Sequence, residues 1–273
     1  MSKDILKEVQ DHLEALEEGL KQGETGALMA LLEKMPHFHR YSPVNALLIY
    51  LQKPEATLVA GIMRWNELGR RVKKGEKAIR IRAPIVETQE ELLPDGRVER
   101  KRRVVGFRTA FVFDISQTEG KPLAMEEPRP ELQEIYGRLK EACPFPVEEK
   151  PLPVMGYTDG SGIAIASYLP DSIKAEVLLH EWAHALLHYD GAERPKEVVE
   201  LEAEATAYAA GRTLGLPMEQ SRDYILAWQG TEGDLKGVTE RILRAATRIL
   251  RAVLGKEEPE PSEADPREEL VAA

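Results

Sequence analysis

The chain has 273 residues, of which 42% are hydrophobic and 31% charged, and its formal net charge is −10. This composition is typical of a soluble globular protein with one large domain or two ordinary ones. We expect no membrane segment, because no apolar run approaches the roughly 20 residues that span a bilayer and the N-terminus lacks a signal-peptide core. A single cysteine excludes an internal disulfide framework, and these features together predict a cytoplasmic protein.

The charge is distributed unevenly along the chain. Residues 37–110 contain 16 Lys and Arg against 8 Asp and Glu, a net charge of +8, and the rest of the chain therefore carries −18. Regions of opposite sign indicate two modules with different partners.

The first 120 residues combine helical and strand patterns. Helices are predicted from about residue 5 to Gly23, over 25–34, over 42–52 with Ser42 as N-cap, and over 63–69. From Arg71 the residues alternate as in a strand, and residues 103–113 form the returning strand after a hairpin turn at 93–97. We therefore predict for residues 1–120 an α+β domain, with helices packed on an antiparallel sheet.

A linker rich in proline and polar residues follows at 119–130. Residues 131–254 are predicted to form a second, mostly helical domain that contains one strand at Ile163–Ala166. Its expected helices cover about 131–142, 171–189, 196–213, 218–228 and 233–253. The acidic residues 255–273 are predicted to be a disordered tail. The predicted fold class is α+β with two domains.

The helix at 171–189 carries the strongest motif, His180-Glu181-Trp182-Ala183-His184. Residues i and i+4 share a helix face, so both imidazoles can bind one ion while Glu181 lies beside them. This HExxH pattern is typical of zinc sites in which the glutamate is the general base. The alternative is a buried helix with two hydrogen-bonded histidines.

The next helix supplies a third ligand. Glu200 and Glu204 lie on one face, so Glu200 can bind the zinc while Glu204 contacts the other ring nitrogen of a histidine. Glu202 points about 200° away from Glu200. His188 continues the face of His184 but lies farther along, and we interpret it as a supporting or surface residue.

The chemistry that this site predicts is Lewis-acid polarisation of a carbonyl group, with Glu181 as the general base. Tyr157 is our candidate for stabilising the oxyanion, with Tyr208 as the alternative. The strand Ile163–Ala166 could pair with an extended peptide substrate at a sheet edge.

The segments HEWAHALLH and ELEAEATAYAAG resemble the zincin-type metallopeptidase domains of the ImmA/IrrE and ArdC groups. Two registers fit the glutamate motif of these families. Glu200-Leu-Glu-Ala-Glu204 resembles the ArdC-like form, whereas a register beginning at Glu202 resembles the ImmA/IrrE form. We prefer the first, which leaves Glu202 as the alternative ligand.

The N-terminal half also resembles the ArdC type, through the segments YSPVN, QKPEAT and GRRVKKGEK and through Trp65. This resemblance implies a domain that binds single-stranded DNA and a link to antirestriction on mobile elements. The similar segments lie within about residues 35–115 and 150–217.

The residues of this half support DNA binding independently of the family. Cations on a sheet beside aromatic rings suit single strands, because phosphates contact Lys and Arg and bases stack on rings. The candidate DNA-binding residues are Trp65, Arg70, Arg71, Lys73, Lys74, Lys77, Arg80 and Arg82. The alternative to DNA binding is a solvated sheet face with Trp65 in the core. Asn45, on an otherwise apolar helix, can brace the fold instead of contacting DNA.

The predicted function is that of a zinc-dependent metallopeptidase-like protein with a DNA-binding N-terminal domain and an unidentified protein substrate. One alternative is a regulatory protease that cleaves a transcriptional repressor. Another is a DNA-binding protein without enzymatic activity. An intact Glu181 favours an enzyme, because a structural metal site needs no general base.

Overall fold

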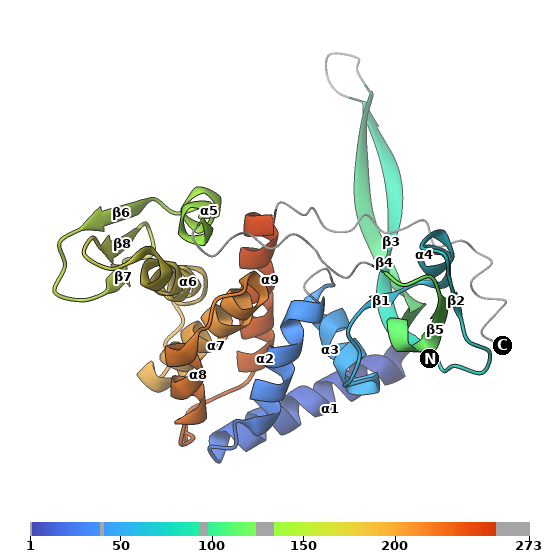
Figure 1. The fold of residues 1–273 in the computed structure, drawn as a ribbon, viewed down its shortest axis with the longest axis horizontal. Helices are drawn as coiled ribbons and strands as arrows, with labels where there is room; N and C mark the ends of the chain where they lie inside the picture. Colours follow the sequence, from blue (N-terminus) through green and yellow to red (C-terminus); the bar gives the residue numbers. More distant parts are fainter. Residues whose placement is uncertain (1, 39–40, 93–97, 124–133, 255–273) are drawn as a thin grey trace.

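A computed structural model of the protein describes residues 2–38, 41–92, 98–123 and 134–254 (Figure 1). The fold is a mixture of helices and small sheets, which confirms the predicted α+β class. The predicted hairpin turn at 93–97 and the tail at 255–273 lie outside the described residues. None of the helices in the described ranges combines the length and apolar character that crossing a membrane requires.

The N-terminal half contains helices and an antiparallel sheet. Its helices are α1 (Ser2–Lys21), α2 (Gly26–Phe38), α3 (Pro43–Gln52), α4 (Ile62–Glu67) and the 3-10 turn η1 (Ile115–Gln117). Its strands are β1 (Val59–Ala60), β2 (Arg70–Val72), β3 (Ile79–Leu92), β4 (Val98–Asp114) and β5 (Thr118–Gly120). The sheet order is β1-β4-β3, and β2 pairs with β5 separately. The order of elements follows the sequence prediction, although β4 begins earlier than residue 103.

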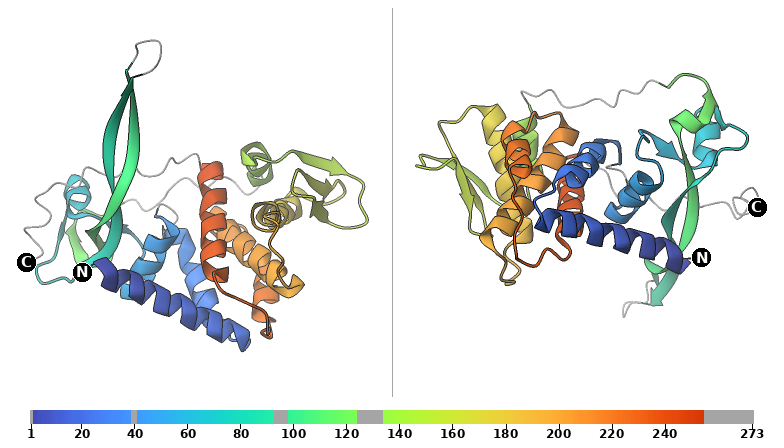
Figure 2. Two further views of the ribbon diagram at one scale, coloured as in Figure 1. Left: turned by 180° about the vertical axis from the view of Figure 1, so that it is seen from behind. Right: turned by 90° about the horizontal axis from the view of Figure 1, so that it is seen from below.

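Strands β3 and β4 form a long hairpin that extends away from the helices (Figures 1 and 2). Ile79 pairs with Val112 at the base, and the register shifts once between Ile85 and Val86. Ile79 and Val112 are buried against α3, so the face of the hairpin that they share points inward. Since side chains alternate along a strand, their neighbours point outward.

Helix α3 also covers the free edge of β3. The amide of Asn45 donates to the carbonyl of Arg82 at 2.8 Å and accepts from its N–H at 2.8 Å. Gln52 makes the same pair of hydrogen bonds with the backbone of Arg80. Asn45 therefore braces the fold, as the sequence alternative predicts.

The C-terminal half has five helices and a three-stranded sheet among the described residues. The helices are α5 (Ile135–Ala142), α6 (Asp171–Leu187), α7 (Lys196–Leu214), α8 (Glu219–Leu226) and α9 (Val238–Leu254). The strands are β6 (Val147–Lys150), β7 (Gly156–Thr158) and β8 (Ile163–Ala166), in the order β6-β8-β7. The central strand is β8, so the prediction that Ile163–Ala166 pairs with a peptide at a sheet edge is wrong, because β6 and β7 already occupy both of its sides.

The main core joins the two halves of the chain. Helices α1 and α2 pack on α7 and α9, and their leucines share one hydrophobic cluster with residues of α6 (Figure 1). A smaller cluster lies between α3 and the sheet. The sequence predicts that the N-terminal helices pack on the antiparallel sheet, but α2 packs mainly on α7 and α1 on α9. The apolar faces of α1 and α2 pack against α7 and α9. Sequence periodicity predicts an apolar face but does not identify the element that packs on it.

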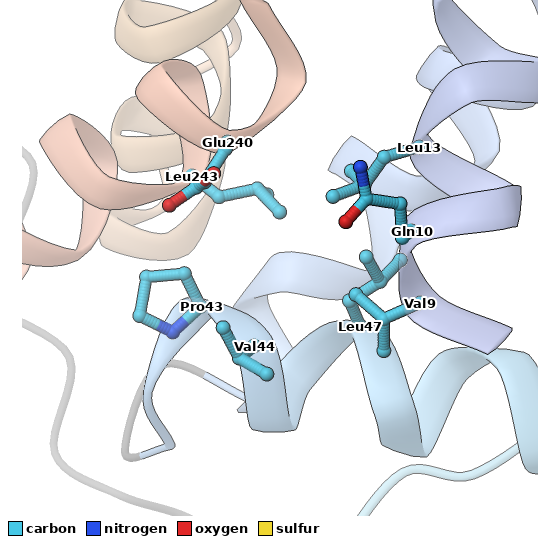
Figure 3. Close-up of a pocket in the computed structure, with 8 residues that line it drawn as sticks. All are labelled: Val9, Gln10, Leu13, Pro43, Val44, Leu47, Glu240 and Leu243. Carbon is cyan, nitrogen blue, oxygen red and sulfur yellow. The ribbon is translucent and has the colours of Figure 1, made fainter. Parts of the chain in front are cut away.

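A pocket of about 230 Å³ lies where α1, α3 and α9 meet (Figure 3). Val9, Leu47 and Leu243 give it an aliphatic lining, and Gln10 and Glu240 supply its polar atoms. None of the residues predicted to bind metal or DNA lines this pocket. We interpret it as a packing gap between the three helices.

Candidate functional site

Helices α6 and α7 lie against each other and carry the predicted ligands (Figure 1). Small residues on α7, including the fully buried Ala203 and Ala207, permit this close approach. Gly215 ends α7 in the left-handed conformation, with φ of 91°, as is common after helices. The two helices thus bring the HExxH face of α6 onto the glutamate face of α7.

His180, His184 and Glu200 converge as the sequence predicts. The two Nε2 atoms are 3.0 Å apart, and Oε2 of Glu200 lies 3.8 Å from the first and 3.5 Å from the second. One ligand atom from each residue lies within 4.8 Å of the others, the arrangement expected of a metal site. All three side chains are partly exposed, which leaves the site open on one side.

Glu204 contacts the second ring nitrogen of His180, the one that does not point to the other ligands. Its Oε1 lies 3.3 Å from Nδ1 of His180, where the carboxylate can stabilise a proton on that ring nitrogen. Burial lowers the pKa of His180, but the surrounding carboxylates, chiefly Glu204, together outweigh burial and the net shift of the pKa is upward. Burial also lowers the pKa of His184 to about 3, with smaller contributions from the other two histidines, which favours a neutral ring that can bind metal.

Glu202 lies on the opposite side of α7 from Glu200. It is fully buried, with Oε2 3.0 Å from Nε2 of His188 and Oε1 2.6 Å from Arg241. The geometry agrees with the register that makes Glu200 the ligand. His188 is a supporting residue, because its Nδ1 lies 2.9 Å from Nδ1 of His184. The sequence gives no signal for Arg241, which reaches the site from α9.

Glu181 is buried beside the ligands. Burial raises the pKa of its carboxyl group, and the neighbouring His180 opposes that shift. A Cβ atom added at Gly156 of β7 would lie 3.2 Å from Cγ of Glu181 and 2.6 Å from Val177. The lack of a side chain at Gly156 therefore allows β7 to run directly past Glu181. A carboxylate of raised basicity in this position can accept a proton.

The prediction that Tyr157 stabilises an oxyanion is wrong on geometric grounds. Gly156 faces α6, and strand alternation turns Tyr157 to the opposite face of the sheet. There its ring lies 5.3 Å from Nζ of Lys150. The alternative, Tyr208, is buried in the main core.

Two other tyrosines lie nearer the site. Burial raises the pKa of Tyr224 on α8, and the carboxylates of Glu200 and Glu204 raise it further. The Tyr189 hydroxyl donates to the carbonyl of Thr158 on β7 at 2.6 Å. Sequence spacing could not identify either residue, because their positions depend on how α8 and β7 fold back on α6.

The predicted DNA-binding residues divide into two groups. Trp65 is 0% exposed and donates its indole N–H to the carbonyl of Phe113 at 2.9 Å. The prediction that its ring stacks on bases is therefore wrong, because the ring has no accessible surface. The guanidinium of Arg70 forms hydrogen bonds with Thr118 and with the carbonyl of Lys121, and it holds β2 to β5.

The remaining cations lie on β2, β3 and the loop between them. The exposed ones are Arg71, Lys73, Lys74 and Lys77, of which Lys73 contacts the carbonyl of Ser116. Arg80 and Arg82 are half-buried on the outward face of β3.

Phe107 of β4 places an aromatic ring on the outward face of the hairpin, beside the predicted cations. Phe107 is 52% exposed, and the guanidinium carbon of Arg82 lies 4.2 Å from its ring centroid. Val105, close by on β4, is also exposed. Strand alternation predicts that Phe107 faces outward. It lies an odd number of residues from the buried Val112, so the two side chains are on opposite faces of β4.

Comparison with known proteins identifies the N-terminal region. Residues 1–113 match the family model described as the N-terminal domain of anti-restriction factor ArdC. An uncharacterized protein of Bacillus anthracis, pXO2-81, is 25% identical over 267 residues, an alignment that covers 80% of this chain. The chain spans only 45% of the length of that curated relative.

Two crystal structures of the antirestriction protein ArdC from plasmid R388 are also similar. The metal-free structure is 21% identical with a TM-score of 0.43, and the Mn(II)-bound structure is 20% identical with a TM-score of 0.44. Each match covers 78% of this chain and 82% of the other.

The molecule is thus an α+β protein with a candidate divalent-metal site between two helices. Its residues 1–113 are similar to the N-terminal domain of ArdC, which confirms the resemblance that the motifs of that half predict.

Proposed function

We propose that the protein is a zinc-dependent, peptidase-type hydrolase whose N-terminal region binds single-stranded DNA, and that it acts in antirestriction. The convergence of His180, His184 and Glu200 beside Glu181 is the observation that carries the hydrolase proposal. The ArdC-type N-terminal region supports the antirestriction role.

The donor set fits a zinc ion. The two Nε2 atoms lie 3.0 Å apart, and Oε2 of Glu200 lies within 3.8 Å of both, so one cation can contact all three. Two imidazoles and one carboxylate are typical donors of catalytic zinc. When bound, such an ion supplies Lewis acidity to a substrate carbonyl oxygen.

The protein's own contribution to the reaction is proton transfer by Glu181. Its buried carboxylate, with a raised pKa, is suited to take a proton from the attacking water and return it to the leaving amine. Edge strand β7 runs past this carboxylate, so an extended segment lying along it would present its carbonyl groups to the site.

The DNA-binding part of the proposal rests on the outward face of the hairpin and the nearby loop. A base can stack on the exposed ring of Phe107, and the guanidinium of Arg82 lies over that ring. Lys74 and Lys77 are exposed and can contact phosphates. A DNA-binding protein without enzymatic activity is the second candidate, favoured by this surface alone.

The two candidates are separated by zinc content and cleavage. Wild type, Glu181→Gln and His184→Ala are purified as full chains, and their bound zinc is measured. We expect about one zinc per chain in wild type and in Glu181→Gln, because Glu181 is not a ligand. His184→Ala should lose its zinc, because it removes a ligand.

Cleavage of DNA-bound proteins is then followed with and without single-stranded DNA, and only wild type should cut. Equal cleavage by wild type and Glu181→Gln would remove this residue from the reaction. Absence of zinc from wild type would favour the DNA-binding candidate.

A further inference from the structure

A continuous row of side chains connects α9 with the candidate metal site. Arg241 contacts Oε1 of Glu202 through Nε and Nη2, both at 2.6 Å. Oε2 of Glu202 lies 3.0 Å from Nε2 of His188, and Nδ1 of His188 lies 2.9 Å from Nδ1 of His184. The row ends at Nε2 of His184, the atom that faces His180 and Glu200.

The row is closed to solvent at its centre. Glu202 is fully buried, and the side chain of His188 is almost so. A buried carboxylate is costly unless its oxygens are paired, and here each oxygen has its own partner. Both contacts of Glu202 are therefore shielded from water at the carboxylate.

The hydrogen bonds in this row can have only one direction when His184 binds a metal. A ligating Nε2 has no proton, so a neutral His184 carries its proton on Nδ1 and donates it to Nδ1 of His188. His188 then accepts at Nδ1 and carries its own proton on Nε2, which donates to Glu202. The tautomer of His184 is thus fixed by His188, and that of His188 by Glu202. The charge pair with Arg241 holds Glu202 in place.

We propose that His188, Glu202 and Arg241 are positioning residues that hold His184 in the tautomer and ring orientation required for metal binding. The inference rests on the proposed metal site but assigns roles to three residues outside the ligand set. His188 is not a fourth ligand, because its Nδ1 faces the Nδ1 side of the His184 ring and its Nε2 is occupied by Glu202. His180 has its own neighbour at Nδ1, the carboxylate of Glu204 at 3.3 Å, so the proposed row concerns His184 alone.

The first test is zinc affinity, measured on the full chain by calorimetry with a competing chelator. Glu202→Gln and His188→Gln should each weaken zinc binding about 10-fold or more, the loss typical of groups that orient a ligand. The double variant should be little weaker than either single variant, because the row is already interrupted. Arg241→Lys should retain more affinity than Arg241→Met, since it keeps the charge beside Glu202.

A matched control breaks a different ion pair on the same ligand-bearing helix. Glu149→Gln removes the partner of Lys174 on α6, whose ammonium lies 2.7 Å from the Glu149 carboxylate. This variant should lose stability but keep its zinc affinity. An equal loss of affinity in the control would show that general destabilisation, and not the row, weakens the site.

The second test needs no substitution. The chain has 6 histidines, so long-range ¹H–¹⁵N spectra of the zinc-loaded wild type can identify each ring tautomer. We expect His184 to carry its proton on Nδ1 and His188 on Nε2. A proton on Nδ1 of a neutral His188 would overturn the assignment.

The outcomes also separate this inference from the proposed function. If wild type binds zinc, His184→Ala abolishes binding and Glu202→Gln and His188→Gln bind as wild type does, the row has no positioning role and the metal site stands. If wild type binds no zinc, the metal site and the row are both contradicted.

Discussion

The indole N–H of Trp228 donates to the backbone carbonyl of Leu20 at 2.7 Å, and so joins residues 208 positions apart in the chain. Leu20 ends the apolar face of α1, and Trp228 follows α8. Nearby, the side chain of Glu17 accepts from the N–H of Gly237 at 2.7 Å. The N-terminal helices are therefore an integral part of the layer that carries the metal site.

This contact predicts a measurable loss of stability in Trp228→Phe. The variant removes the indole donor, although the Leu20 carbonyl still accepts from the N–H of Gly23 at 3.1 Å. The free energy of unfolding should therefore fall by about 0.5–1.5 kcal/mol in addition to the lost packing. Denaturant unfolding of the full chain measures the change. Trp182→Phe is the control, because its buried indole N–H makes no hydrogen bond and only packing is lost. Equal losses in both variants would show that the Trp228 hydrogen bond contributes nothing.

Glu200→Gln tests the third ligand. An amide oxygen is a weaker zinc ligand than a carboxylate, so bound zinc should fall below stoichiometry while the fold is retained. Glu197→Gln, one turn earlier on α7 and exposed, is the matched control and should keep its zinc. Full zinc occupancy in Glu200→Gln would show that another residue completes the site.

Gly156→Ala should reduce hydrolysis far more than it reduces zinc content. The added Cβ would lie 2.6 Å from Val177 and 3.2 Å from Glu181, so β7 must move away from the proposed base. None of the three heavy atoms nearest to this methyl group belongs to a proposed zinc ligand. Gly137→Ala is the control, because nothing lies within 4 Å of its Cβ on α5 and it should gain up to about 1 kcal/mol of stability. Unchanged turnover in Gly156→Ala would show that β7 does not position Glu181.

Single-stranded DNA binding should depend on Phe107. Phe107→Ala removes an exposed ring and should weaken binding by about 1–3 kcal/mol, measured by fluorescence anisotropy. Tyr168→Ala removes a ring in the C-terminal half that is more exposed than Phe107, and it should have no effect. Neutralising Lys73, Lys74 and Lys77 together should reduce the slope of log K against log salt by about 2. A slope that stays unchanged would place the phosphate contacts elsewhere.

The Glu149–Lys174 pair should make stability depend on pH in acid. Hydrogen bonds from Lys174 and Lys140 lower the pKa of Glu149 from 4.5 to about 2. Because the folded-state value is the lower one, the carboxylate stabilises the fold above about pH 4.5, and this contribution is lost as the pH falls toward about 2. The difference in Tm between wild type and Glu149→Gln should therefore shrink over that range. A constant difference would mean that the pair does not titrate as described.

Local patterns predict those parts of the molecule whose geometry is fixed within a few residues. The i, i+4 spacing places His180 and His184 on one face, and the same spacing selects Glu200 and Glu204. Helix bounds follow from caps and breakers such as Ser42 and Gly215. These features depend only on the repeat of a helix.

The missed features depend on contacts between distant segments. Arg241 reaches Glu202 from another helix, and no spacing rule connects residues 39 positions apart. Strand alternation alone does not say which face of β7 packs on α6, so it cannot place Tyr157. A basic neighbourhood does not reveal that the indole of Trp65 is buried and bound to the carbonyl of Phe113 on β4.

The bracing of β3 by Asn45 and Gln52 also bears on self-association. A sheet edge with open N–H and C=O groups is a template for a strand from another molecule, and here two side chains from α3 occupy those groups at Arg80 and Arg82. Pro84, the next residue in the same phase of β3, has no N–H to offer an incoming strand. The base of the hairpin is thereby prevented from extending its sheet into a neighbouring copy, while its outward face stays accessible.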